Sequence, residues 1–283
     1  MMPDVLWPYF ERNRYLLNYL AKIAADTVME VAAQRGLKIG VFTALHTFGR
    51  DLKWNVHVHL SVTMGGLTED LQKWKNIRFS EKVVMPKWRE KIIELLRNEA
   101  KKDNFYISNR TLDIEYNKYW RVKFSEPTGD AQHTIAYLGR YIKRPPLSMS
   151  RLEHYDGKSV TFNYLNHRNK QHENITFSAE DFIERFVKHI PDTGFRMIRY
   201  YGFLANSVRS KLLPKVYNLV GHEDRQVFNV NWANLLKVSF GVDPLKCILC
   251  GKAMKLVGVV FGKTNSELWK YHKELATRQI IPV

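Results

Sequence analysis

The stretch Ile39-Gly40-Val41-Phe42-Thr43-Ala44-Leu45-His46, followed after a turn by Asn55-Val56-His57-Val58-His59-Leu60-Ser61-Val62, decides the fold. Both runs are rich in β-branched residues and predict β-strands. Because side chains alternate along a strand, His57 and His59 project from the same face. An antiparallel hairpin over Gly49-Arg50-Asp51, in a register that sets position 46 opposite position 57, brings all three histidines to that face.

Three converging imidazoles predict a metal site at this hairpin. Nitrogen ligands that leave coordination positions open suit a catalytic divalent ion better than a structural one. His57-Val58-His59 alone would not distinguish a metal platform from a polar strand face that carries histidine twice. His46 in the neighbouring strand favours the metal platform.

The composition indicates a folded chain with a polyanionic partner. The chain has 283 residues, of which 45% are hydrophobic, so it can form one large domain or two modest ones. Lys and Arg number 44 against 28 acidic residues, which gives a net charge of +16. A basic excess spread over a folded, aromatic-rich chain points most often to nucleic acid, although a merely basic protein is the alternative.

Cysteine usage and hydropathy predict a cytoplasmic protein. The two cysteines, Cys247 and Cys250, exclude a disulfide framework and favour a reducing compartment. No apolar run reaches the roughly 20 residues that a membrane span needs. Charged residues follow Met1-Met2-Pro3-Asp4 closely and interrupt any signal peptide.

Residue periodicity predicts an α+β fold. Helical spacing is expected over residues 8–35, 87–102, 131–144, 178–190 and 205–220, and strands over 119–124, 159–165, 174–177 and 195–202. We expect a central antiparallel sheet flanked by helices, with a smaller mixed C-terminal region. The predicted parts are a core over 1–150, a basic extension over 151–220 and a C-terminal region over 221–283, which opens with a polar linker.

A second informative stretch is Ala136-Tyr137-Leu138-Gly139-Arg140-Tyr141-Ile142-Lys143-Arg144. On a helix Tyr137 and Tyr141 share one face, with His133 one turn earlier. Aromatic pairs at this spacing commonly pack in a core, which is the structural alternative. The basic residues expected to contact DNA are Arg140, Lys143 and Arg144 here, and Arg196 and Arg199 in a later segment that alternates basic and apolar residues.

Cys247-Ile248-Leu249-Cys250-Gly251 has the shape of a zinc knuckle. One such pair supplies two of the four ligands of a structural zinc site, and the sequence holds no second pair. The sequence alone therefore does not establish zinc at Cys247 and Cys250.

The combination of a histidine platform, paired tyrosines and basic residues suits phosphodiester transesterification. A divalent ion polarises the scissile phosphate and stabilises charge on the departing 3′-oxygen. A tyrosine attacks phosphorus, which yields a 5′-phosphotyrosine and a free 3′-hydroxyl. A phenol of pKa about 10 needs activation by the ion or by nearby cations. A second tyrosine one helical turn away permits a second strand transfer.

These motifs resemble the rolling-circle transposases of HUH-endonuclease type, in the group with paired tyrosines that includes bacterial insertion-sequence transposases. The matching stretches are Leu45-His46-Thr47-Phe48-Gly49-Arg50, His57-Val58-His59, positions 137–146, positions 199–206 and positions 243–251. The resemblance implies a Mg²⁺- or Mn²⁺-dependent nickase and strand transferase that acts on single-stranded DNA at element ends and target. It also implies Tyr137 and Tyr141 as nucleophiles and His57 and His59 as metal ligands.

The third ligand has two candidate positions. Related relaxases use a histidine at the position of His46, which we favour. Other HUH enzymes take the third ligand from the tyrosine helix, which would favour His133 or Gln132.

The sequence also departs from the family. Family members carry a cysteine-rich zinc region and a first β-strand before the residues that match Met2-Pro3-Asp4. Both are expected to be missing, which would expose a sheet edge. The alternative function is therefore a truncated, catalytically impaired DNA-binding relic. A zinc hydrolase is a weaker reading, because no carboxylate stands at a motif spacing as general base.

Overall fold

A computed structural model describes residues 2–102, 105–125, 145–166, 169–221, 232–234, 237, 243–247, 250–255 and 267. The chain divides into two compact units, Met1–Glu223 and Asp224–Val283. Both sheets described below belong to the first unit. The finer boundaries at residues 150 and 220 stay predictions.

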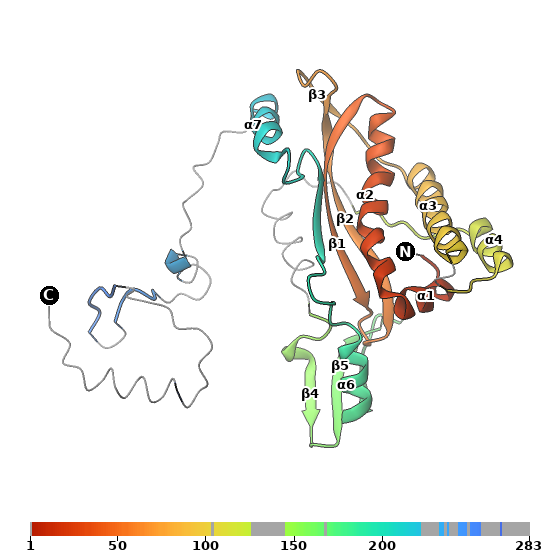
Figure 1. The fold of residues 1–283 in the computed structure, drawn as a ribbon. Helices are drawn as coiled ribbons and strands as arrows, with labels where there is room; N and C mark the ends of the chain where they lie inside the picture. Colours follow the sequence, from red (N-terminus) through yellow and green to blue (C-terminus); the bar gives the residue numbers. More distant parts are fainter. Residues whose placement is uncertain are drawn as a thin grey trace. The chain divides into compact units, whose positions relative to one another are not determined.

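An antiparallel four-stranded sheet forms the centre of the first unit (Figure 1). Its strands are β1 (Leu37–Phe48), β2 (Trp54–Thr68), β3 (Trp74–Asn76) and β7 (Ile198–Gly202), in the order β3-β2-β1-β7. Helices cover one face of this sheet, so the predicted α+β class is confirmed. β2 continues through Gly65 and Gly66 to Thr68. An added Cβ at Gly65 would lie 2.4 Å from the Trp74 ring, so glycine admits the β3 tryptophan here.

The N-terminal segment is broken into short pieces, so the single helix expected over 8–35 is wrong. The pieces are η1 (Asp4–Leu6), α1 (Trp7–Arg12), η2 (Arg14–Leu16) and α2 (Leu17–Ala33). Asn13 leaves helical geometry at φ −115° and ψ 68°, and its side-chain amide donates to Tyr9 O at 2.9 Å. This side chain competes with the helix for a backbone carbonyl. After α2, Gly36 ends the helical segment at φ +66°.

α2 packs on the sheet through the alternate residues of β1, and two further helices lie beside it. Val41 and Leu45 belong to apolar clusters shared with α2. α3 (Glu81–Lys101) packs against α2, and α4 (Asn109–Asn117), which the sequence did not predict, packs against α3. α3 begins after Ser80 rather than at position 87, and it contains Pro86 in its second turn. Proline near a helix start removes a single intrahelical hydrogen bond.

The strand expected over 119–124 is wrong. This segment has no regular secondary structure among the described residues. Trp120 is buried in the cluster formed with the N-terminal segment, α3 and α4, and its indole nitrogen donates to Glu115 O at 2.9 Å. Packing of Trp120 and of partly buried Val122 against this cluster, rather than strand pairing, holds the segment.

A second, three-stranded antiparallel sheet has the order β4-β5-β6. Its strands are β4 (Leu152–Tyr155), β5 (Ser159–Leu165) and β6 (His172–Ser178), preceded by η3 (Met149–Arg151). The strands β5 and β6 were predicted, β6 with bounds two residues and one residue shorter, whereas β4 was not. α6 (Ala179–Val187) follows, and Ser178 caps it by accepting a hydrogen bond from Asp181 N at 3.0 Å. β7 begins at Ile198 rather than 195, and α7 (Arg209–Val220) begins four residues later than predicted.

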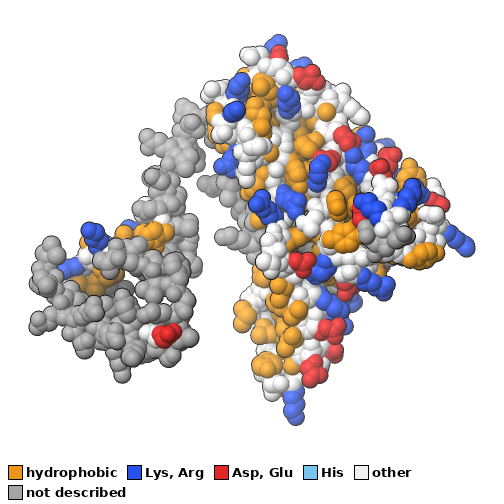
Figure 2. All heavy atoms as spheres, in the orientation of Figure 1, with side chains coloured by type: hydrophobic (Ala, Val, Ile, Leu, Met, Phe, Trp, Pro, Cys, Tyr) orange, Lys and Arg blue, Asp and Glu red, His pale blue; other side chains and the backbone are white. Residues whose placement is uncertain are grey.

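Figure 2 shows Lys and Arg side chains distributed over several elements and interspersed with Asp and Glu, rather than gathered in one patch. No helix among the described residues is both long and apolar enough to cross a membrane. The helix expected over 131–144 and most of the expected linker at 221–232 lie outside the described residues.

Candidate metal centre

The β1–β2 hairpin brings three histidines together on one face of the central sheet. In the antiparallel register His46 pairs with His57 and Ala44 pairs with His59. The predicted pairing is therefore confirmed. The reversal uses the expected turn, in which Gly49 N donates to Lys53 O at 2.8 Å. Leu52 completes it with φ +59°.

One nitrogen from each of His46, His57 and His59 lies within 4.8 Å of the other two. His46 is buried, and the other two imidazoles are half-buried, so the cluster opens on one side. The His46 ring stacks on Phe48, with centroids 5.0 Å apart and planes at 17°. The remaining described residues hold no other group of three or more His, Cys, Asp or Glu side chains with this geometry.

A backbone hydrogen bond orients the His57 ring and leaves its Nε2 unprotonated, as a metal ligand requires. Its Nδ1 lies 2.8 Å from Asn55 O, and a carbonyl can only accept, so Nδ1 carries the proton. The Nε2 lone pair then faces His59 Nε2 at 3.1 Å. Two nitrogens about 2.1 Å from one ion and at right angles to each other lie about 3.0 Å apart. The donor set therefore fits a divalent ion, with an outer hydrogen bond that fixes the ring as in known metal sites.

A fourth histidine, His189, lies outside the hairpin and hydrogen-bonds to residues on both sides of its turn. It follows α6 and is 5% exposed. Its Nε2 lies 3.0 Å from Leu52 O and must donate, so Nδ1 at 3.2 Å from Thr47 Oγ1 is the acceptor in the neutral ring. The ring also stacks on Trp54 at 5.8 Å and 15°. Burial lowers the pKa of His189 and favours this neutral form.

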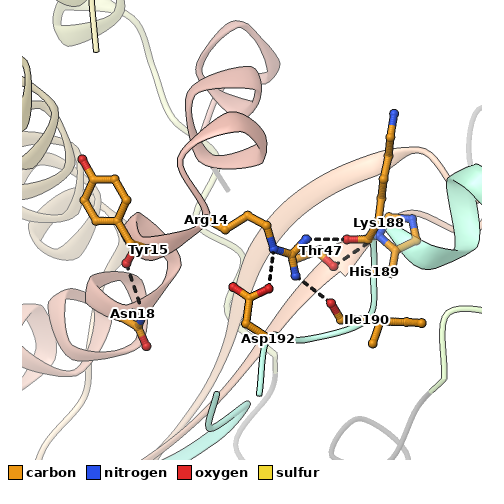
Figure 3. Close-up of polar contacts among 8 residues, drawn as sticks. All are labelled: Arg14, Tyr15, Asn18, Thr47, Lys188, His189, Ile190 and Asp192. Atoms are coloured by element: carbon orange, nitrogen blue, oxygen red, sulfur yellow. Dashed lines mark hydrogen bonds and ion pairs between the residues drawn. The ribbon is translucent and has the colours of Figure 1, made fainter. Parts of the chain in front are cut away.

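Arg14 anchors the segment that carries His189 (Figure 3). Its guanidinium donates to Lys188 O at 2.8 Å and to Ile190 O at 2.6 Å, and it pairs with Asp192 at 3.0 Å. These backbone carbonyls follow the last turn of α6, where helices leave acceptors unsatisfied. One arginine of the N-terminal segment thereby fixes both flanks of His189.

Arg151, the last residue of η3, connects the same turn to the second sheet. This side chain donates to Arg50 O in the turn and to Asn163 O of β5, the latter at 2.8 Å. Its guanidinium also lies 5.6 Å from the centre of the Phe162 ring. The turn that joins the two histidine strands is therefore held by His189 and by Arg151.

The other predicted site residues are divided between described and undescribed parts. Arg196 is exposed before β7. Arg199 in β7 is half-buried and donates to Asn18 Oδ1 of α2 at 3.0 Å, so it lies on the sheet face opposite the histidines. The remaining predicted residues lie outside the described residues; they are Tyr137, Tyr141, Arg140, Lys143, Arg144, His133 and Gln132.

The cysteine pair lies in the second unit. Cys247 is half-buried and Cys250 is exposed. Gly251 N donates to Cys247 O at 2.8 Å, and Cys247 N donates to Lys252 O at 2.9 Å, which closes a tight turn. The pair supplies two of the four ligands that a structural zinc site needs.

Sequence reasoning missed the residues that support the centre, namely His189, Arg14 and Arg151. Thr47 and His189 are separated by 142 positions, so no local pattern connects them. The helix expected over 178–190 includes His189 but gave no indication of its partners.

Most of the first unit, including the histidine centre, matches a known protein family. Residues 40–211 match the family model Y2_Tnp, described as "Putative transposase". The matched region begins in β1, includes both histidine strands and ends within α7. The chain therefore belongs to this family of bacterial insertion-sequence transposases.

Two curated proteins are similar over most of the chain. The "Transposase for insertion sequence element IS801" of Pseudomonas savastanoi pv. phaseolicola is 39% identical over 280 residues, which cover 93% of this chain and 67% of that protein. The "Putative transposase y4qJ" of Sinorhizobium fredii is 28% identical over 241 residues, which cover 78% of this chain and 61% of that protein. The chain thus spans about two thirds of the length of these relatives. It matches no solved structure.

Proposed function

We propose that this transposase nicks and joins single-stranded DNA at element ends through a 5′-phosphotyrosine intermediate, with His46, His57 and His59 holding a divalent ion. The observation that supports it most strongly is the convergence of the three nitrogens within 4.8 Å in the family-matched region. The similarity to the IS801 transposase supports action on the DNA of a mobile element.

The nucleophiles in this proposal are Tyr137 and Tyr141. The phenolate oxygen of one tyrosine bonds to the scissile phosphorus, and the bond from phosphorus to the 3′-oxygen breaks. The phenol gives up its proton, and the departing 3′-oxygen takes one up as a hydroxyl. Attack by a 3′-hydroxyl on the phosphotyrosine reverses these changes and joins the strand. An ion bound at the histidines would polarise the phosphate and stabilise the developing charge on the 3′-oxygen.

The donor set bears on which ion is used. Mg²⁺ prefers oxygen ligands, whereas imidazole is a softer donor. Three histidines without a carboxylate therefore favour Mn²⁺ over Mg²⁺ in affinity, although DNA phosphate and water can supply oxygen to either.

Strand cleavage tests the proposal. Single-stranded DNA that carries the ends of the encoding element, labelled at its 3′ end or its 5′ end, is incubated with the chain and Mn²⁺. Cleavage that leaves a free 3′-hydroxyl and a blocked 5′ end supports it. A free 5′-phosphate would indicate hydrolysis by water instead. DNA binding without cleavage in any metal would favour the impaired relic.

A further inference from the structure

Beyond the metal centre, the same face of the sheet carries an exposed aromatic side chain. β7 pairs with β1 so that Tyr200 lies opposite Phe42 and Ile198 lies opposite Ala44. Directly paired residues share a sheet face, and alternation along β1 places Phe42, Ala44 and His46 on one side. Tyr200 and the three histidines therefore lie on the face turned away from α2 (Figure 1).

The side chain of Tyr200 is exposed to solvent rather than buried in the core. It is 43% exposed, whereas Phe42 beside it is 6% exposed. The two rings have centroids 5.4 Å apart and planes at 54°, so the buried phenylalanine braces the tyrosine. The next residue, Tyr201, faces the apolar cluster beneath α2. Of these adjacent tyrosines, Tyr201 packs against the core, whereas the side chain of Tyr200 is partly accessible to a ligand.

The distance from the metal centre suits a substrate contact. His46 lies four positions after Phe42 in β1, which corresponds to about 13 Å along the strand. Ala44, which is 1% exposed, and half-buried Ile198 lie on this face between them. A single strand whose scissile phosphate lies at the histidines can cross this distance within a few nucleotides.

We propose that Tyr200 is a stacking platform for an unpaired base of single-stranded DNA beside the metal centre. Aromatic side chains on a sheet face bind single strands because every base has a π-face, and the chain's net charge of +16 favours the backbone as well. This assignment rests on the proposed single-stranded DNA substrate and adds a binding residue on β7.

The test compares two strands of equal length and charge, an oligothymidylate and an abasic strand of tetrahydrofuran units, by fluorescence anisotropy with the full chain in EDTA. Tyr200→Ala and Tyr200→Leu should weaken oligothymidylate binding by about 5- to 100-fold. Tyr200→Phe should bind within about twofold of the wild type, because its ring is kept. Binding of the abasic strand should not change in any variant. Tyr155→Ala on β4, which removes a tyrosine that is 61% exposed, is the matched control and should leave both affinities unchanged.

A second readout does not depend on variants. Photocrosslinking of the wild-type chain to 5-iodouracil DNA should attach the strand to the peptide that contains Tyr200. Equal weakening for both strands, no weakening at all, or crosslinks that avoid β7 would overturn the platform. Stacking at Tyr200 without a metal-dependent phosphotyrosine would instead refute only the proposed chemistry, because this assay requires no cleavage.

Discussion

His46 lies directly opposite His57 across the β1–β2 pair, and their rings meet edge to face with centroids 5.5 Å apart. His59 lies two residues along the same strand, with its ring centroid 4.7 Å from that of His46. A single register of one hairpin therefore determines whether three nitrogens converge. A slip of one residue would turn the β2 histidines to the α2 face.

Removal of one histidine should abolish tight metal binding. Loss of an outer partner of a metal ligand costs about 10–100-fold in affinity, so loss of the ligand itself should cost more. We expect His46→Ala and His59→Ala to weaken Mn²⁺ binding by more than about 100-fold in isothermal titration calorimetry. His154→Ala, which removes an exposed histidine on β4, is the control and should bind like the wild type. Unchanged affinity in His46→Ala would remove it from the ligand set and direct attention to His133 or Gln132.

His189 should stabilise the turn between the histidine strands. His189→Ala leaves Thr47 Oγ1 and Leu52 O without this partner and removes the ring stacked on Trp54. Unsatisfied buried groups cost about 1–3 kcal/mol each, so we expect a loss of about 2–4 kcal/mol in denaturant unfolding. His172→Ala on exposed β6 should change stability by less than about 0.5 kcal/mol. If the two variants are equally stable, the turn does not depend on His189.

The protonation of His189 gives a pH signature. Burial lowers its native pKa from the ordinary 6.5, so the unfolded chain binds more protons below that pH. Its contribution to stability is complete above pH 6.5 and is lost as the pH falls toward the depressed native pKa. With EDTA present, the unfolding free energy of the wild type should fall more steeply between about pH 7 and pH 5 than that of His189→Gln. Parallel curves would show that the imidazole is protonated equally well in both states.

Gly202 should be required where β7 meets β1. It has φ +61°, and an added Cβ would lie 1.8 Å from Ile39 O. Gly157, in the turn between β4 and β5, has φ +86° with nothing within 4 Å of an added Cβ. Gly157→Ala therefore tests the conformation alone and should cost about 1–2 kcal/mol. Gly202→Ala adds the clash and should cost about 4 kcal/mol or more, measured by chemical denaturation. Equal costs would mean that the strands separate easily at Ile39.

The sequence predicted the features that depend on local patterns. Alternation in β1 and β2, with a turn of suitable length, was enough to place His46 opposite His57. The start of the helix near position 178 was likewise predicted, and Ser178 caps it. Failures occurred where a distant contact overrides the pattern. Trp120 packs against helices instead of joining a strand, and Asn13 breaks a helix whose apolar spacing continues.

The supporting residues of the centre could not be predicted for the same reason. Arg14 reaches the backbone of Lys188 and Ile190 across more than 170 positions of sequence. The position of Tyr200 on the histidine face follows from the β1–β7 register, which no turn connects and no local signal fixes. Its neighbour Tyr201 looks equivalent in the sequence, yet it faces the core.

The most direct measurement of the central claim is the metal-dependent covalent adduct between this chain and single-stranded DNA of the element ends. The chain is incubated with labelled strand and Mn²⁺, denatured, digested and analysed by mass spectrometry. We predict a nucleotide attached through phosphate to Tyr137 or Tyr141, absent in EDTA, in His59→Ala and in the double variant Tyr137→Phe/Tyr141→Phe. Cleavage that persists in the double variant, or an adduct that forms in His59→Ala with the same metal dependence as in the wild type, would contradict the account.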